Sequence, residues 1–421
     1  MAKVREVEYL SIGGGMGSFC WVDTLRIHGV SFKDICVISP NKKPYRQLKL
    51  YCDAIGLTKN QRLRSDSGSR PDNFWGFPGY GLSEALDELK NKKFTKAAKL
   101  LLQLFFEPFI FGYYSPAAGR VYKALEREAK RIDWEKSLII GHANNLTKFP
   151  DGRFKITYSR DNSIIARVVH LSLGHGKLRK IKSQKSKVKN AYELDNEFLN
   201  KIKRKGGTVM VIGRGTAAQK IVERLLDFKK IKVASLHREV ESPKDFRGVK
   251  QKRFLSWRLQ QFNWPRAAFG GGLMHESDSL WSLPSATPDK NWIRKVKNAI
   301  KDGRYEITKR PIKANFTIDC SGFGEAARTH EFYSKLIKKY NLPLTPNGSI
   351  RTGDAFEIEA LCSYKTRVFI SGALSGFSGP ADSFFGAQFA SFKTLENLNV
   401  KKMDFIESFE AWCRWLTNKK I

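Results

Sequence analysis

Two short glycine-rich turns, 200 residues apart in this 421-residue chain, are its strongest candidates for chemistry. The first is GGGMGS at 13–18, and the second is GRGTAA at 213–218. Glycine at the first position permits a tight turn, and glycine at the third lets backbone N–H groups approach a pyrophosphate. A helix that begins there adds partial positive charge at the same point. Each turn is therefore predicted to bind a dinucleotide.

The residues around each turn predict the elements that must position it. Apolar strands are expected at 7–12 and 34–39 around the first turn, with a helix from Ser18 to Gly29 between them. The second copy has strands at 208–212 and 231–236. Its intervening helix carries apolar residues on one face, namely Ala217, Ile221, Val222, Leu225 and Leu226. Strand, turn, helix and strand form a βαβ unit, so the chain is predicted to be α/β with two Rossmann-like dinucleotide-binding domains.

The candidate binding residues follow from this pattern. Small residues, Ser18 and Ala218, take the place of the third glycine, where the helix packs close to the strand. The first site is predicted to use Gly13, Gly15, Met16, Gly17, Ser18 and Ser39. The second is predicted to use Gly213, Gly215, Thr216, Ala217, His237 and Arg238.

The residues at the end of the second strand of each unit predict which nucleotide that unit binds. Arg238 and His237 favour the 2′-phosphate of NADP, whereas the neighbouring Glu239 keeps NAD open as the less favoured alternative. In the first copy, Ser39 and Pro40 stand where an acidic residue would bind a ribose.

The charge of the chain is strongly positive. It has 75 Lys and Arg residues against 41 Asp and Glu, which leaves a net charge of +34. Such a surface attracts phosphorylated cofactors, and it leaves an anionic surface or an acidic protein partner open. No basic stretch is interleaved with aromatic residues in the manner of a nucleic-acid platform, so no specific nucleic-acid motif is predicted.

The composition also limits which cellular compartment and which metal or disulfide sites can be expected. No apolar run reaches the roughly 18 residues of a transmembrane segment, and the first residues lack a signal peptide, which predicts a cytoplasmic protein. The six cysteines contain no C-x-x-C pair, so neither a zinc site nor a redox disulfide is expected.

Beyond the two turns, three segments make the chain resemble flavoproteins with two dinucleotide-binding domains, a group that includes flavin-containing monooxygenases, amine N-hydroxylases and flavin reductases. These segments are SIIARVVHLSLGHG at 163–176, ANFTIDCSGFG at 314–324, and the stretch at 366–398 that begins TRVFISGALSG. The resemblance implies FAD at the first turn and NAD(P) at the second. It also implies that Gly174 and Gly322 lie in the turns that leave and re-enter the FAD domain. Further cofactor contacts are implied at Gly372, Ala373, Asp382 and Phe385, although many relatives have Asp where this chain has Ala373.

The order of these segments implies an NAD(P) domain inserted into an FAD domain. The FAD domain would comprise residues 1–200 and 335–421, and the NAD(P) domain residues 201–334. Two aromatic and glycine-rich stretches, 69–86 and 262–281, are predicted to face the flavin and the nicotinamide or substrate. His275 and Asp278 are the acid–base candidates in the second stretch, where a surface role is favoured, and no catalytic residue is assigned.

The resemblance implies an FAD-dependent oxidoreductase that uses NADPH. A monooxygenase, oxygenating or halogenating a small organic substrate with dioxygen through a flavin hydroperoxide, is the favoured function. Disulfide reductases are excluded because neither C-x-x-C nor C-x4-C occurs. The alternative is an NAD(P)H-dependent flavin or quinone reductase that docks on an anionic membrane or an acidic electron carrier. The mildly amphipathic segment 405–421 keeps that alternative open.

Overall fold

The computed structural model describes most of the chain. The described residues are 4–63, 80–106, 116–159, 162–179, 187–213, 215–236, 290–324, 326–345, 348–372 and 384–400. Four predicted site residues, His237, Arg238, Ala373 and Asp382, lie outside these ranges. So do the stretches 262–281 and 405–421 and most of 69–86.

The first sheet contains seven strands and carries the first glycine turn. Its order is β3-β2-β1-β6-β5-β4, and β12 also pairs with β6. The pairs among β1, β2, β3, β6 and β12 are parallel, whereas β5 is antiparallel to both β4 and β6. The strands are β1 (Val4–Ile12), β2 (Ile35–Ser39), β3 (Leu138–Ile140), β4 (Ala143–Lys148), β5 (Phe154–Tyr158), β6 (Asn162–Leu171) and β12 (Arg367–Ile370).

Helices cover both faces of this sheet, which is why the last residues of β1 and β6 are buried on both sides. Phe19 and Trp21 of α1 belong to the buried cluster on one face, together with Phe369 of β12. On the other face, Phe332 of α14 packs in the cluster that contains Leu10. The helices outside the second sheet are α1 (Met16–Ile27), α2 (Arg46–Ala54), α3 (Tyr80–Lys90), α4 (Phe94–Phe106), α5 (Ala118–Arg131), α13 (Ala326–Thr329), α14 (Glu331–Tyr340) and α15 (Phe384–Asn397).

The second sheet is parallel throughout and carries the second glycine turn. Its order is β10-β9-β8-β11-β7. The strands are β7 (Lys187–Asn190), β8 (Gly207–Ile212), β9 (Ile231–Leu236), β10 (Tyr305–Thr308) and β11 (Phe316–Asp319). Three helices accompany it, α6 (Asn196–Lys205), α7 (Thr216–Leu225) and α12 (Lys290–Lys301). The expected fold class, two Rossmann-like units in one α/β chain, is confirmed.

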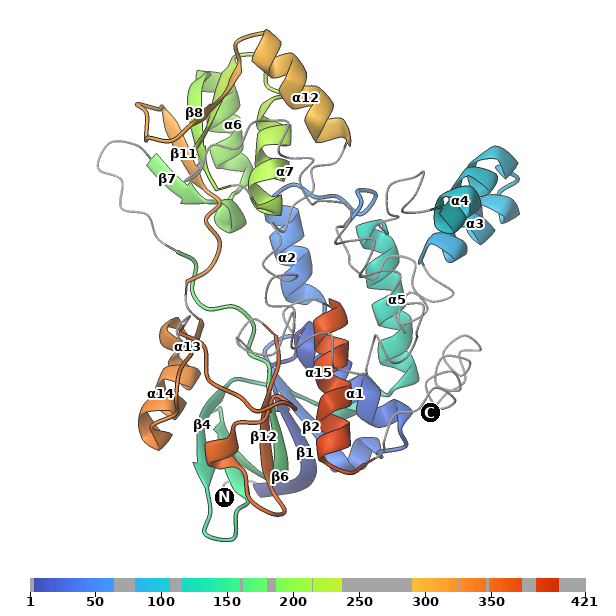
Figure 1. Cartoon of the computed structure of the whole chain (residues 1–421), viewed down its shortest axis with the longest axis vertical. Coiled ribbons are helices and arrows are strands. Elements are labelled where there is room, and N and C mark those ends of the chain that lie inside the picture. Colours follow the sequence, from blue (N-terminus) through green and yellow to red (C-terminus); the bar gives the residue numbers. More distant parts are fainter. Residues whose placement is uncertain are drawn as a thin grey trace.

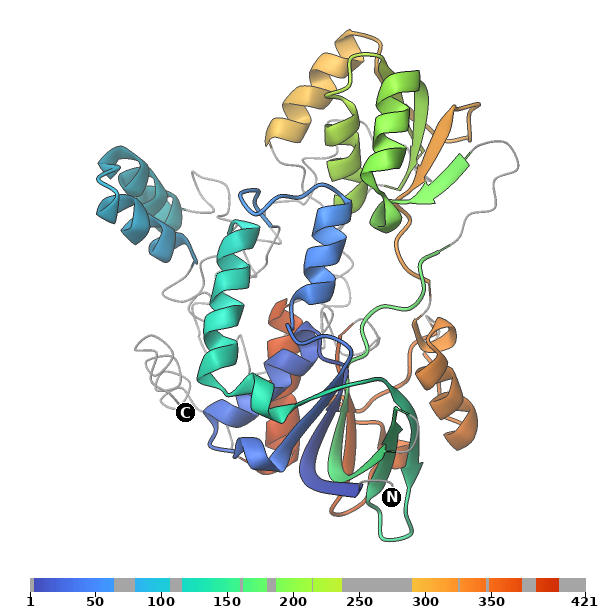
Figure 2. The ribbon, with the colours of Figure 1, turned by 180° about the vertical axis from the view of Figure 1, so that it is seen from behind.

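The two sheets lie at opposite ends of the molecule, with α2 between them (Figure 1; Figure 2 from behind). Residues 187–205 run with the second sheet because β7 pairs with β11, so this sheet starts before residue 201, the expected limit. The division at 200 and 334 itself stays a prediction.

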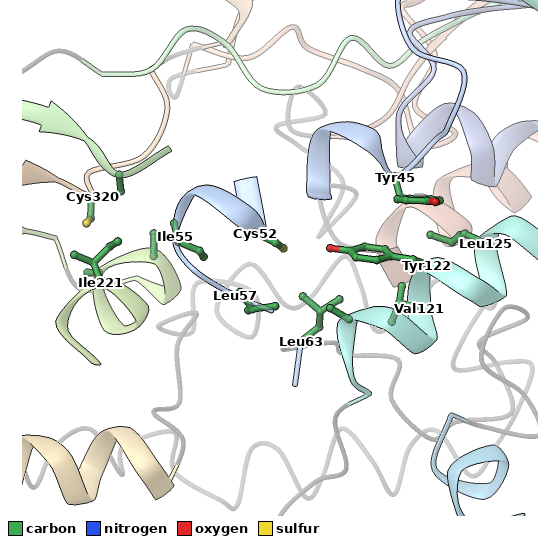
Figure 3. Close-up of a cluster of buried hydrophobic side chains, with 14 of the residues drawn as sticks. Tyr45, Cys52, Ile55, Leu57, Leu63, Val121, Tyr122, Leu125, Ile221 and Cys320 are labelled. Atoms are coloured by element: carbon green, nitrogen blue, oxygen red, sulfur yellow. The ribbon is translucent and has the colours of Figure 1, made fainter. Parts of the chain in front are cut away.

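Buried side chains join the end of α2 to the second sheet. Ile55 and Cys52 belong to the same apolar cluster as Ile221 of α7 and Cys320, which follows β11 (Figure 3). The segment that follows β6 and the segment that follows β11 connect the two sheets, and they meet near this cluster. There the Arg179 N–H donates to the Gly322 carbonyl at 3.1 Å.

Aromatic rings pack together beside this contact between the two connecting segments. The ring of His175 stacks on Phe323 at 4.3 Å between centroids, and Tyr192 stacks on Phe323 at 5.2 Å. Tyr51 of α2 packs against Phe323 as well, at 5.3 Å. Residues from both units thus share one aromatic cluster.

Candidate functional site

The first glycine turn is crowded by the chain's own packing at Gly13, Gly14 and Gly17. Gly13 follows β1 with φ of +101°, and a Cβ there would collide with the backbone oxygen of Ser172. A Cβ at Gly17 would collide with the Ser172 hydroxyl and come within 2.9 Å of Ser371 Oγ. The backbone contact and the positive φ therefore require glycine at position 13, whereas a Cβ at position 17 would displace two serine hydroxyls.

Gly15 differs, because nothing in the described protein requires glycine there. It precedes α1 with φ of −83°, a conformation open to any residue, and no atom lies within 4 Å of a Cβ built on it. The open space lies at the N-terminus of α1, where helix N–H groups and the helix dipole favour an anion. A ligand that approaches the backbone at Gly15 would account for the glycine, so the site fits a bound pyrophosphate.

The second turn repeats this geometry. Gly213 has φ of +115°, and its Cβ would lie 2.7 Å from the backbone oxygen of Cys320. Gly215 precedes α7 with φ of −70° and has no atom within 4 Å of its Cβ position. A crowded first glycine and an open third glycine thus occur at both sites.

Backbone hydrogen bonds show that the two sites are built alike. Ser172 N–H donates to Ile12 O at 2.9 Å, and Cys320 N–H donates to Ile212 O at 2.8 Å. Two residues further on, Gly174 and Gly322 have φ of +81° and +80°, and both face open space. The predicted exit and return turns therefore occupy equivalent places beside the two glycine turns.

The other predicted contacts of the first site lie at the same edge of the sheet. Ser39 ends β2 and lies against Gly14, and its hydroxyl accepts a hydrogen bond from Asn41 N–H at 3.0 Å. Gly372 follows β12 with φ of +84°, and its Cβ would lie 3.6 Å from the Ser172 hydroxyl.

The remaining predicted contacts lie on three helices. Met16 is the first residue of α1, and Ser18 follows in its first turn. Thr216 and Ala217 begin α7, and Phe385 is in the first turn of α15.

A buried polar network beneath the first turn is missed by reading the sequence alone. His170 of β6 contacts Ser11 of β1 through Nδ1 at 3.0 Å and Ser371 through Nε2 at 2.8 Å. The Ser11 hydroxyl donates to Ser18 at 2.9 Å, and Ser18 in turn donates to the Gly13 carbonyl. The signal in the sequence is a serine and a histidine among the mainly apolar last residues of two strands, YLSI in β1 and VVHL in β6.

Thiol and metal chemistry finds no support in the described part of the chain. Cys20, Cys36, Cys52, Cys320 and Cys362 are free there, and no group of three acidic, His or Cys side chains could hold a metal ion. Burial raises the pKa of Cys36 to about 11 and that of Cys320, beside the second turn, higher still. These two thiols stay protonated at neutral pH.

The fold and its two turns define a class of architecture, α/β chains with two Rossmann-like units that each carry a glycine-rich turn before a helix. No family model matches the sequence, and no curated protein matches it. Among solved structures, the ornithine N-hydroxylase of Kutzneria sp. 744 is 11% identical, with a TM-score of 0.61 over 94% of this chain and 100% of that chain. The L-lysine 6-monooxygenase of Pseudomonas syringae is 13% identical, with a TM-score of 0.56 over 93% and 99%.

A third solved structure with a similar fold is a flavin-containing monooxygenase of Stenotrophomonas maltophilia. It is 13% identical, with a TM-score of 0.56 over 94% of this chain and 98% of that chain. At these identities the likeness establishes the fold, and it extends over nearly the whole chain.

Proposed function

We propose that the chain is an FAD- and NADPH-dependent monooxygenase that acts on a small organic amine. The observation that carries the proposal is the pair of open glycines, Gly15 and Gly215, at equivalent places of two dinucleotide folds in one chain. The Kutzneria ornithine N-hydroxylase, which shares the fold, is described with reduced FAD, NADP+ and L-ornithine. That likeness favours amine oxygenation over the reductase alternative.

The residues at the first turn would hold FAD. Gly13, Gly15, Met16, Gly17 and Ser18 would place backbone N–H groups around the pyrophosphate, with Ser39, Gly174 and Gly372 at the same edge. Contacts further along the cofactor are proposed for Ala373, Asp382 and Phe385. No acidic residue stands in the first turn of α1, so nothing there opposes the anion.

The residues at the second turn would hold NADPH. Gly213, Gly215, Thr216, Ala217 and Gly322 surround the start of α7, which also has no acidic residue in its first turn. His237 and Arg238 would bind the 2′-phosphate. When bound, the two cofactors supply hydride transfer and oxygen activation, and the protein supplies binding, orientation and water exclusion.

An anionic membrane or acidic protein partner remains a prediction from the charge of +34. Among the described residues, no helix is long and apolar enough to cross a membrane.

Amine-dependent coupling tests the proposed function. With purified protein, NADPH and oxygen, we expect one of a panel of small amines, ornithine, lysine and cadaverine included, to direct most electrons into a hydroxylated amine. NADPH consumption, peroxide and product would be measured together. If no amine lowers the peroxide yield while a quinone is rapidly reduced, the reductase alternative holds instead. Protein purified without flavin, and unable to take it up, would reject both.

Nucleotide preference is expected to depend on Arg238. β9 ends at Leu236, two residues before this arginine, and a guanidinium there can form a bidentate contact with a 2′-phosphate. Such a charge-assisted contact is worth roughly 1.5–3 kcal/mol, so Arg238→Ala should weaken NADPH by roughly ten- to a hundredfold. NADH, which lacks the phosphate, should be unaffected. Apparent affinities from anaerobic flavin reduction check this.

Lys230→Ala is the matched control, because it removes an exposed charge just before the opposite end of β9. It should change neither nucleotide's affinity. An equal effect of Arg238→Ala on NADPH and NADH would remove the case for NADP preference.

A further inference from the structure

Four buried side chains, Ser371, His170, Ser11 and Ser18, form one hydrogen-bonded chain that ends on the Gly13 carbonyl. None is more than 2% exposed. The network joins three segments that are distant in sequence, since Ser11 and His170 are 159 residues apart and His170 and Ser371 are 201 apart. It connects the first glycine turn to the end of β12.

The donors in this network run in one direction. The Gly13 carbonyl can only accept, so Ser18 donates to it, and Ser11 donates to Ser18. Ser11 must then accept from Nδ1–H of His170, and Nε2 of the neutral ring accepts from the Ser371 hydroxyl. Burial lowers the pKa of His170 to about 3, which keeps the ring neutral at physiological pH.

The network fixes the orientation of the first peptide of the turn. A trans peptide is planar, with its C=O and N–H pointing in opposite directions. Because Ser18 holds the Gly13 carbonyl, the direction of the Gly14 N–H is set as well. At the other end, the bond to His170 holds Ser371 directly before Gly372, the glycine at the same edge of the sheet.

The second site shows that the fold does not need this network. The pair Ser11 and His170 in β1 and β6 matches the pair Val211 and Ile318 in β8 and β11. Ser18 corresponds to Ala218, and Ser371, the residue after β12, corresponds to Ala191, the residue after β7. All four counterparts are buried and apolar: Val211, Ile318, Ala218 and Ala191. A buried polar network is tolerated only when all of its hydrogen-bonding groups have partners, whereas apolar side chains at the same places need none.

We propose that this network positions the FAD site, with His170 as the positioning residue that ties the pyrophosphate turn to the Gly372 segment and thereby sets the affinity for FAD. The inference rests on the proposed function and adds Ser11, His170 and Ser371 to the residues proposed for the FAD site. Of the two sites, the first has these polar side chains, and there β12, a strand from the C-terminal part of the chain, pairs with β6.

The test compares His170→Leu with His170→Asn. Leucine removes both hydrogen bonds, and we expect FAD to bind about tenfold more weakly, equivalent to about 1.4 kcal/mol, with NADPH affinity unchanged. Asparagine keeps a donor near the Nδ1 position, so it should restore most of the FAD affinity. The dissociation constants would be measured by reconstituting flavin-free protein and, for NADPH, by titration of the same preparations.

Two further variants cover the case in which His170→Leu does not fold. Ser11→Val and Ser371→Ala install the residues found at the equivalent places of the second sheet, and each should weaken FAD binding in the same direction. Ser391→Ala is the control, since its hydroxyl is buried but donates within α15, to Ala387 O at 2.8 Å. It should leave FAD affinity unchanged.

Unchanged FAD affinity in the folded network variants would overturn the inference while leaving the proposed function standing. An equal fall in FAD and NADPH affinity would also overturn it, because that result indicates general loosening. If the wild-type chain binds no FAD, the proposed function fails first, and the inference fails with it.

Discussion

Gly15→Val is expected to abolish FAD binding while the chain stays folded. The position tolerates a side chain in the protein alone, because its φ is −83° and no atom lies within 4 Å of the added Cβ. A valine would occupy the space through which the pyrophosphate must approach the N-terminus of α1. We expect at least a hundredfold loss of FAD affinity, about 2.7 kcal/mol. Flavin content after purification and reconstitution titrations measure it.

The melting temperature of the flavin-free protein separates this result from misfolding. Valine is a poorer residue than glycine before a helix, so a small loss of stability is expected, within about 1 kcal/mol. Gly15→Ala, with a single added methyl, should give an intermediate FAD affinity. Full flavin content in Gly15→Val would refute the assignment of the first turn.

Gly215→Val is expected to abolish reduction by NADPH while FAD remains bound. Gly215 has the same open environment and a φ of −70°. The valine side chain would therefore collide with no described protein atom and would occupy the space proposed for the nucleotide. NADPH affinity should fall at least a hundredfold, by the same argument as for FAD. The rate of anaerobic flavin reduction at increasing NADPH concentration measures this loss.

Chemical reduction with dithionite provides the control, since it needs no nucleotide site and should reduce the bound flavin at the wild-type rate. The two valine variants also control for each other. If Gly215→Val loses FAD, or Gly15→Val loses NADPH with FAD supplied in excess, the two turns do not serve separate nucleotides.

The sequence by itself determined the two βαβ units, because their signals are local. The apolar run and terminating residues of 231–236 predict β9 with its observed bounds, and the glycines at 13 and 213 predict both turns. Strand and helix periods are set by side chains a few residues apart, so they can be read without knowing what packs against them. The glycine pattern likewise reflects a steric requirement of the turn itself.

Only the tertiary structure decided which distant segments complete each site. Strand β12 pairs with β6 at the first site and β7 pairs with β11 at the second, so Ser371 and Ala191 come to equivalent places. Nothing near His170 in the sequence indicates that its two ring nitrogens meet serines 159 and 201 residues away. Strand neighbours are selected by burial of whole faces against α1, α14 and α15, and that choice depends on all the packed elements at once.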